Sequence, residues 1–200
     1  VDELTYDELK NLDVGSYKGP QWAGVKIPLL ADVVHQIPED HLLFIEIKGG
    51  DDNAGAPSAT VLALVEFLQK LPQHRIEKLV FISFDHDALA RLKFFRPDLL
   101  MIPLLTHKPY PGSWPQVNNL VDISDYVAMA KQEKFLGIYL EYGDYLSSSI
   151  IDYIKSQGLM VAVWNYPEHD TVDVAQKMSL YNVDFYNTND LSHIKTALDL

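Results

Sequence analysis

The chain has 200 residues, of which 48% are hydrophobic and 22% are charged, and its formal net charge is −12. This length is enough for one well-buried core, so we expect a single domain over residues 1–200. So acidic a chain is not expected to bind nucleic acid through the phosphate backbone. It can still bind a small anionic molecule, because a bound cation reverses the field inside a cleft.

The chain contains no cysteine, which excludes disulfides and thiolate metal sites. No apolar run reaches the roughly 18 residues of a membrane span. The first residues do not have the pattern of a signal peptide, and a cytoplasmic location is slightly favoured. The sequence does not determine the oligomeric state.

Residues 1–37 predict two helices, Tyr6–Leu12 and Leu29–Ile37, joined by a loop rich in glycine, proline and aromatic residues. From residue 42 onward, short apolar runs alternate with amphipathic helical stretches, and runs this short suit strands buried on both faces. The predicted strands are Leu42–Ile47, Leu79–Ser83, Leu100–Leu105, Gly137–Leu140, Met160–Trp164 and Val183–Tyr186. The predicted helices that follow them are Pro57–Leu71, Asp87–Phe95, Asp122–Gln132, Ser147–Gln157, Thr171–Leu180 and Leu191–Leu198.

This regular alternation predicts an α/β fold of parallel strands with right-handed crossovers. A doubly wound sheet and a barrel both have this element order. A doubly wound nucleotide-binding fold favours a glycine-rich turn after its first strand, and the sequence has none, so we favour a barrel. A closed (β/α)₈ barrel needs eight strands and six are predicted, so either the barrel is open or its first two βα units are missing. Thr106–Pro115 is predicted to be a long irregular loop.

The carboxyl ends of barrel strands carry the catalytic residues of such folds. Glu46 and Lys48 end the first predicted strand, and their spacing of two places both side chains on one face. Glu46 could ligate a hard divalent cation and Lys48 could hold an anionic oxygen, but a structural ion pair is equally compatible with the pattern. The other residues at strand ends are Ser83, Phe84, Asp85, His86, Thr106, His107, Lys108, Glu141, Trp164 and Asn187.

Several of these residues have a structural interpretation beside the functional one. Phe84 and Trp164 face the same end of the barrel, where aromatic side chains more often belong to the core than to a ligand platform. Asp85 is predicted to be a helix N-cap, and His86 to be a first-turn surface residue rather than a catalytic one. Glu141 could join the site or be solvated.

Ordered motifs along the chain resemble one known family, the glycerophosphodiester phosphodiesterases. The match begins with a stretch that is similar to the linker before the family's third barrel strand, made up of Leu4-Thr5, Glu8-Leu9, Leu12–Ser16, Trp22–Gly24 and Ile27-Pro28. Phe44–Lys48 then matches its Glu-x-Lys strand. The remaining matches are Ser83–His86, Arg96–Asp98, Gly158-Leu159, Val163–Asn165, Val183-Asp184 and Asn187–Asn189. They span essentially the whole chain in the family's order.

The resemblance implies a TIM-type (β/α)₈ barrel of the PLC-like phosphodiesterase type. It implies a hydrolase of lipid and glycerol metabolism that cleaves a small-molecule glycerophosphodiester to an alcohol and glycerol 3-phosphate, with one divalent cation, Ca²⁺ or Mg²⁺. By the same resemblance Glu46 is a metal ligand and Lys48 is a catalytic cation beside the phosphate. Phe84 and Trp164 are apolar walls for the glycerol.

The family's His-Arg-Gly, Glu-x-Asp and His-Asp motifs have no counterpart in residues 1–200. We therefore expect the first two βα units of the barrel to be missing from this sequence and residues 1–200 alone to be inactive. Two alternatives remain open. One is a truncated, non-catalytic relative that acts as a binding module, and the other is a Schiff-base aldolase that uses Lys48.

Overall fold

The structure is a computed structural model that describes residues 3–48, 58–107, 116–117 and 119–199. The chain divides into two compact units, Val1–Leu43 and Phe44–Leu200. The single domain expected over residues 1–200 stays a prediction. Within the described ranges, no helix is both long and apolar enough to cross a membrane.

The first unit consists of short helices joined by turns. They are α1 (Tyr6–Leu9), the 3₁₀ helices η1 (Ser16–Lys18) and η2 (Pro20–Trp22), and α2 (Leu30–Gln36). Thr5 and Glu8 form a capping box at the start of α1, which satisfies backbone donors that the helix itself leaves unpaired. Both predicted helices are present but shorter than expected, and η1 and η2 were missed because a single turn has no hydrophobic period.

Asp13 organises the loop that the sequence predicted between the first two helices. Its Oδ1 accepts hydrogen bonds from the backbone N–H groups of Gly15 and Ser16, both at 2.9 Å. Its Oδ2 accepts from the Ser16 hydroxyl at 2.7 Å and from the Gly24 N–H at 2.8 Å. The Ser16 hydroxyl, followed by these amides, holds the pKa of the Asp13 carboxyl well below its usual range. One carboxylate thus ties together both ends of the loop.

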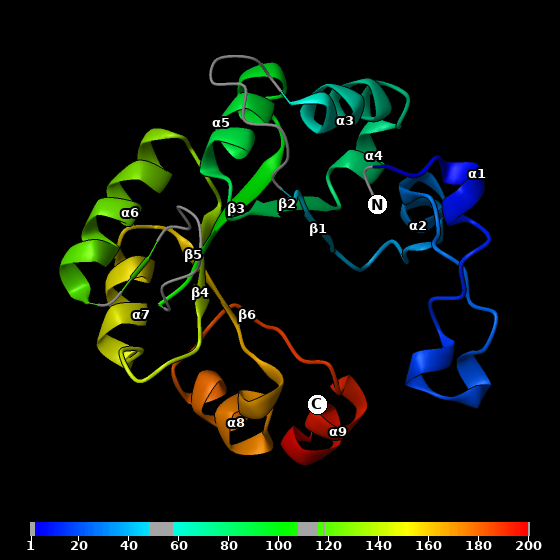
Figure 1. Ribbon diagram of the computed structural model, residues 1–200. Coiled ribbons are helices and arrows are strands. Elements are labelled where there is room, and N and C mark those ends of the chain that lie inside the picture. Colours follow the sequence, from blue (N-terminus) through cyan, green and yellow to red (C-terminus); the bar gives the residue numbers. More distant parts are fainter. Residues whose placement is uncertain (1–2, 49–57, 108–115, 118, 200) are drawn as a thin grey trace. The chain divides into compact units, whose positions relative to one another are not determined.

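The second unit is built on one sheet, whose strands lie beside one another in chain order (Figure 1). Paired strands are parallel, with Val80 opposite Leu100 and Gly137 opposite Met160. A doubly wound sheet reverses its strand order at a switch point, and this sheet does not, so the barrel-type prediction is confirmed. The strands are β1 (Leu43–Glu46), β2 (Leu79–Ser83), β3 (Leu100–Leu105), β4 (Gly137–Glu141), β5 (Met160–Trp164) and β6 (Phe185–Tyr186).

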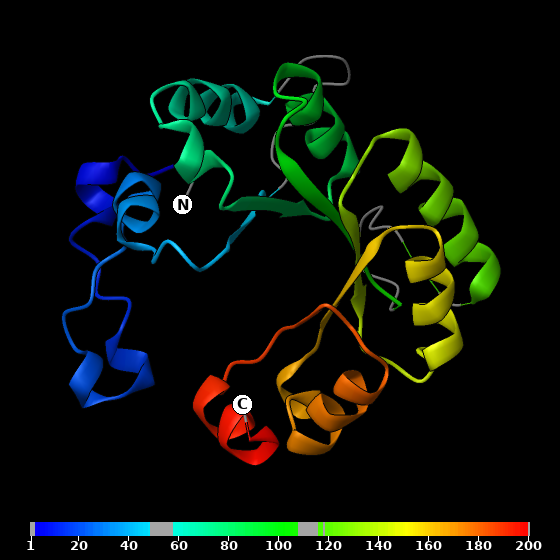
Figure 2. The ribbon, with the colours of Figure 1, turned by 180° about the vertical axis from the view of Figure 1, so that it is seen from behind.

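Helices cover one face of this sheet and leave the other face to its own side chains (Figures 1 and 2). The helices are α3 (Ala59–Gln69), α4 (Gln73–Ile76), α5 (His86–Phe95), α6 (Leu120–Gln132), α7 (Ser148–Ser156), the 3₁₀ helix η3 (Pro167–His169), α8 (Val172–Leu180) and α9 (Leu191–Leu198). Asp85 begins α5 by accepting a hydrogen bond from the Ala88 N–H at 2.9 Å, which confirms it as an N-cap. Gly158 follows α7 with a φ of 79°, as a glycine after a helix should. Pro57, predicted at the start of α3, lies outside the described residues.

The face opposite the helices carries a buried cluster of inward-facing side chains. These residues recur at every second position of the strands, which is the period expected for one face of a sheet. The cluster consists of Val80, Ile82, Ile102, Leu104, Tyr139 and Ala162, with Phe44, Phe84, Leu100, Leu136, Trp164 and Phe185 packed against it. All five residues of β2 are buried, so the prediction that strands are covered on both faces holds there.

Candidate functional site

Glu46 and Lys48 form an ion pair at the carboxyl end of β1. The Lys48 Nζ lies 2.6 Å from the Glu46 Oε1, and the Lys48 side chain is 78% exposed against 29% for Glu46. The spacing of two therefore places both side chains on one face, as predicted. An ion pair this exposed contributes only about 0–1 kcal/mol to stability, so either group can be engaged by a ligand at little cost.

The charge of Glu46 also affects Tyr139, whose side chain lies on the inward face of the sheet. Burial raises the pKa of Tyr139 to about 12, and the negative charge of Glu46 adds to that rise. The ring of Phe44 lies edge-on to those of Tyr139 and Phe185, with centroids 6.2 and 5.1 Å away. Since β1 is not a neighbour of β4 or β6 in the sheet, these contacts mean that the sheet curls around its inward face.

Phe84 and Trp164 meet at the same end of the sheet. Their rings pack edge to face, with centroids 5.6 Å apart and planes at 83°. The Trp164 indole Nε1 donates to the Leu105 carbonyl at 3.1 Å, and Tyr166 packs on the same indole with a centroid distance of 5.4 Å. The sequence placed Phe84 and Trp164 at one end of a barrel, and the structure makes them a single half-buried aromatic surface.

Glu141 ends β4 and is fully buried, so the solvated alternative for this residue is wrong. Its Oε2 accepts hydrogen bonds from the Thr106 hydroxyl and from the His107 backbone N–H, the latter at 3.1 Å. Its Oε1 lies 3.3 Å from the His107 Nδ1. The burial of Glu141 has one indication in the sequence. Glu141 lies two residues after Tyr139 on the same strand, and residues at this spacing share a face, so its side chain is expected on the inward face.

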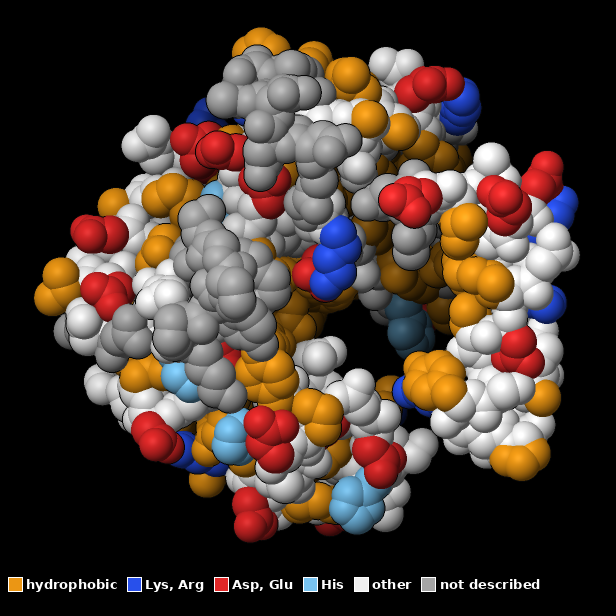
Figure 3. All heavy atoms as spheres, viewed as in Figure 1, with side chains coloured by type: hydrophobic (Ala, Val, Ile, Leu, Met, Phe, Trp, Pro, Cys, Tyr) orange, Lys and Arg blue, Asp and Glu red, His pale blue; other side chains and the backbone are white. Residues whose placement is uncertain are grey.

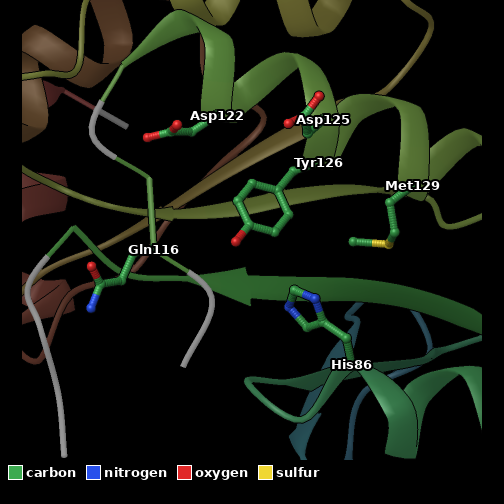
Figure 4. Close-up of a pocket in the computed structure, with 6 residues that line it drawn as sticks. All are labelled: His86, Gln116, Asp122, Asp125, Tyr126 and Met129. Carbon is green, nitrogen blue, oxygen red and sulfur yellow. The ribbon is translucent and has the colours of Figure 1, made fainter. Parts of the chain in front are cut away.

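His86 is the first residue of α5, and its expected surface location is wrong. It is partly buried, its Nε2 donates to the Leu104 carbonyl at 3.0 Å, and burial lowers its pKa. A cavity of about 300 Å³ lies between this ring and α6, as Figure 4 shows. Its described lining consists of His86, Gln116, Asp122, Asp125, Tyr126 and Met129. Among these described residues there are two carboxylates and no lysine or arginine, which does not suit an anionic ligand.

The remaining strand-end residues have structural roles where the structure describes them. The Ser83 hydroxyl donates to the Ile47 carbonyl at 2.6 Å and accepts from the Asp85 N–H at 3.0 Å, joining β1 to the start of α5. The Asn187 carbonyl accepts from the Asn165 side chain at 3.0 Å. Lys108 and residues 108–115 of the predicted loop lie outside the described residues.

Residues 1–191 match the model of the glycerophosphoryl diester phosphodiesterase family. The chain belongs to this family. Among curated relatives it is 33% identical over 101 residues to a glycerophosphodiester phosphodiesterase from Caldanaerobacter subterraneus subsp. tengcongensis, which covers 50% of this chain and 39% of that protein. The Bacillus subtilis glycerophosphodiester phosphodiesterase is 24% identical over 116 residues, 54% of this chain and 40% of its own length.

Solved structures of glycerophosphodiester phosphodiesterases have the same fold. A Galdieria sulphuraria protein assigned to this group matches with a TM-score of 0.76 and 26% identity, over 98% of this chain and 71% of its own. An Oleispira antarctica phosphodiesterase, solved with the product sn-glycerol-3-phosphate, matches with a TM-score of 0.75 and 22% identity, over 100% of this chain and 72% of its own. These matches confirm the TIM-type barrel fold, and the described part of this chain contains six strands of it.

The glycerophosphodiester phosphodiesterase resemblance implied a divalent cation, so the fit of the residues to such an ion can be tested. In the part of the chain that the structure describes, no three histidine, aspartate or glutamate side chains gather in a way that could hold a metal ion. Ca²⁺ takes six to eight oxygen ligands and Mg²⁺ takes six. Glu46 can supply at most two, so the described residues do not hold the ion by themselves.

The surface charge of this family member agrees with its acidic composition. On the face shown in Figure 3, acidic side chains are scattered over the helices and loops, and the described lysines and arginines form no continuous patch there. The four residues predicted for the site come together in two pairs, Glu46 with Lys48 and Phe84 with Trp164. Glu141 and His107 form a third pair at the strand ends. From the sequence, both were expected only to lie at strand ends, and Glu141 either to join the site or to be solvated.

Proposed function

We propose that this protein hydrolyses glycerophosphodiesters to an alcohol and glycerol 3-phosphate, with this chain carrying part of the active site. The observation that carries the proposal is the exposed ammonium of Lys48, paired with Glu46 at the carboxyl end of a barrel-type sheet. Family membership supports the same reaction class. The product bound to the Oleispira antarctica phosphodiesterase supports it further, although at 22% identity that likeness extends to the fold alone.

Lys48 is proposed to bind a phosphoryl oxygen of the substrate. A phosphodiester is anionic, and its charge becomes concentrated on the phosphoryl and leaving oxygens in the transition state. A nearby ammonium stabilises that charge more in the transition state than in the ground state, which is the condition for a faster reaction. Lys48 can exchange the Glu46 carboxylate for the phosphate because its side chain is 78% exposed.

Glu46 is proposed to contribute one ligand to a divalent cation, Ca²⁺ or Mg²⁺. Such an ion would stabilise charge on the phosphoryl oxygens. The roles proposed for the other residues do not depend on it. Glu46 has a second effect that needs no ion, because its carboxylate lies beside Lys48 and holds the ammonium at the strand end.

Phe84 and Trp164 are proposed to form the apolar wall against which the glycerol carbons pack. Their edge-to-face contact fixes both rings, and the hydrogen bond from the Trp164 indole to the Leu105 carbonyl prevents rotation of the larger one. A rigid wall of this kind orients a small substrate without losing side-chain entropy at each binding event.

The aldolase alternative is disfavoured by the surroundings of Lys48. A Schiff-base lysine is activated by desolvation or by a neighbouring cation. Lys48 has neither feature among its described contacts, since it is exposed and paired with a carboxylate. The binding-module alternative makes a different prediction, namely retention of glycerol 3-phosphate without turnover.

The proposal is tested with the intact protein by measuring glycerol 3-phosphate released from glycerophosphocholine. Glu46→Gln is expected to abolish hydrolysis while leaving the fold intact, and Lys48→Met to reduce kcat/KM on the order of 100-fold. Lys70→Met is the matched control, because Lys70 forms a similarly exposed ion pair with Glu66 at 2.7 Å on α3.

Unchanged turnover in both site variants would refute the assigned roles. A wild-type protein that binds glycerol 3-phosphate but releases none from any glycerophosphodiester would establish the binding-module alternative instead. An adduct between Lys48 and a carbonyl compound, trapped with borohydride, would favour the aldolase.

A further inference from the structure

Asn165 is a buried carboxamide that directly follows Trp164 at the carboxyl end of β5, and its residue is only 7% exposed. Successive strand residues point to opposite faces, so the Asn165 side chain lies on the side of the sheet away from the inward-facing indole. Its Nδ2 donates to the Tyr186 hydroxyl at 2.7 Å and to the Asn187 carbonyl at 3.0 Å. Both acceptors belong to the end of β6, so one side chain joins the two strand ends.

These two contacts determine how the carboxamide of Asn165 is turned. A carbonyl can only accept, so the NH₂ group must face Asn187. Burial, followed by the charge of Asp170, raises the pKa of Tyr186 to about 12, so its hydroxyl is neutral at pH 7 and accepts the second N–H. The Asn165 Oδ1 is buried and accepts no hydrogen bond in the described part of the chain. An unpaired buried acceptor is destabilising, so the carboxamide acts at this position as a double donor.

The link from Asn165 adds to a strand pairing that is very short, because β6 has only two residues. Among the described residues, the last backbone hydrogen bond between β5 and β6 runs from the Asn187 N–H to the Val163 carbonyl, at 2.9 Å. The peptide after Trp164 lies beyond this bond. On the β4 side, the Trp164 carbonyl accepts from the Tyr142 N–H at 2.7 Å. On the β6 side, the described link is the Asn165 carboxamide.

We propose that Asn165 is a positioning residue that sets Trp164 as the apolar wall of the substrate site. The inference rests on the proposed function above, in which Trp164 and Phe84 contact the glycerol carbons. The indole is held at its Nε1 by the Leu105 carbonyl, at 3.1 Å, while its Cα is only as fixed as the backbone at the end of β5. The carboxamide holds that backbone against β6, and this keeps the two rings of the wall at their centroid distance of 5.6 Å.

A wall positioned in this way affects substrate binding more than the chemical step. The glycerol carbons do not change during hydrolysis of the phosphodiester, so the wall stabilises the ground state and the transition state equally. Loss of such uniform binding raises KM and leaves kcat unchanged. The loss of a group that acts on the reacting phosphate would instead lower kcat.

Asn165→Leu keeps the approximate size of the side chain and removes both donors. In the intact protein, its KM for glycerophosphocholine is expected to rise by up to about tenfold, with kcat within about twofold of the wild type. Tyr186→Phe removes one of the two acceptors and keeps the carboxamide, so a smaller rise in KM is expected. Circular dichroism identifies a variant that fails to fold, and Tyr186→Phe provides the test if Asn165→Leu does not fold.

Asp184→Ala is the matched control, because it loosens the same two strands at their other end. The Asp184 Oδ2 accepts from the Val161 N–H at 2.8 Å, near the start of β5. This variant is expected to lose stability with an unchanged KM. A rise in KM as large as that of Asn165→Leu would mean that general loosening of β5 and β6 is the cause, and would overturn the proposal.

Two measurements show whether Asn165 acts through Trp164. In a Trp164→Ala background the ring is absent, so Asn165→Leu should change KM by less than about twofold. The chain has three tryptophans, and replacing Trp22 and Trp114 by phenylalanine leaves the emission of Trp164 alone. Acrylamide is expected to quench this emission more strongly after Asn165→Leu, because the indole is held less firmly.

Equal rises in KM from Asn165→Leu with and without the Trp164 ring would overturn the proposal. Unchanged KM and unchanged quenching in folded Asn165→Leu would do the same. A wild-type protein that hydrolyses no glycerophosphodiester refutes the proposed function itself. The quenching experiment needs no turnover, so it then still decides whether Asn165 positions the indole.

Discussion

The indole of Trp164 on β5 donates a hydrogen bond to the backbone carbonyl of Leu105 on β3, passing over the strand between them. Two strand spacings in a flat sheet amount to roughly 9.6 Å. A single indole reaches this carbonyl, at 3.1 Å, because the sheet curls toward its inward face. The same curvature brings Phe84 of the β2 end against Trp164. The aromatic wall is therefore a product of sheet geometry.

Trp164→Phe removes the indole donor but keeps an aromatic ring. We expect a loss of about 1 kcal/mol in the free energy of unfolding, as for one hydrogen bond. We also expect a rise in KM of up to about tenfold because the wall is no longer fixed. Urea unfolding and steady-state kinetics measure the two effects. Trp22→Phe is the control, because Trp22 is 52% exposed, and an equal loss there would argue against the role of the hydrogen bond.

The Tyr139 hydroxyl is expected to lose its proton at a higher pH than an ordinary tyrosine. Its pKa is raised to about 12 by burial and by the charge of Glu46, against about 10 in the unfolded chain. The folded protein therefore keeps a proton that the unfolded chain loses. The stability contributed by neutral Tyr139 is complete below about pH 10 and is lost as the pH rises toward 12.

Ultraviolet difference titration of wild type and Tyr139→Phe isolates this tyrosine. Glu46→Gln is expected to lower the pKa of Tyr139 by removing the smaller of its two causes. An unchanged titration in Glu46→Gln would mean that the carboxylate does not act on the sheet interior.

Asp184 is predicted to be important for the junction of β5 and β6. Its Oδ2 accepts from the Val161 N–H at 2.8 Å, and its Oδ1 lies 3.0 Å from the Lys155 ammonium of α7. Asp184→Ala leaves the amide of a fully buried residue without this acceptor, at an expected cost of about 1–3 kcal/mol. Chemical denaturation measures it, with the exposed Asp152→Ala as a control expected to change stability by less than about 0.5 kcal/mol.

Asp13 is predicted to control the order of the first unit. Asp13→Asn replaces one carboxylate oxygen, which accepts from Ser16 and Gly24, with an NH₂ group that can only donate. Faster hydrogen exchange is expected at the amides of Gly15, Ser16 and Gly24. Since the folded pKa of Asp13 is depressed, the carboxylate stabilises the loop above the ordinary pKa of an aspartate, and this contribution is lost as the pH falls through the lowered value. Exchange rates that match wild type near neutral pH would contradict this role.

Much of the fold could be predicted because the required information is local. β2, β3 and β5 occupy the predicted ranges, since a short apolar run covered on both sides is a strong pattern. Asp85 and Gly158 marked helix ends through their own side-chain and backbone chemistry. The missed elements, such as α4 (Gln73–Ile76), are single turns in which no period can be recognised.

The pairing of Glu46 with Lys48 also followed from the sequence, because two residues on one strand share a face whatever surrounds them. Family membership was determined in the same way, by motifs in a fixed order. The environment of Glu141 was not predictable from such spacing. Its burial and its contact with His107 depend on which strands are neighbours and on how strongly the sheet curls. Sequence spacing thus determined which side chains face inward, and only the tertiary structure decided which of them meet, because those contacts join residues 34 or more positions apart.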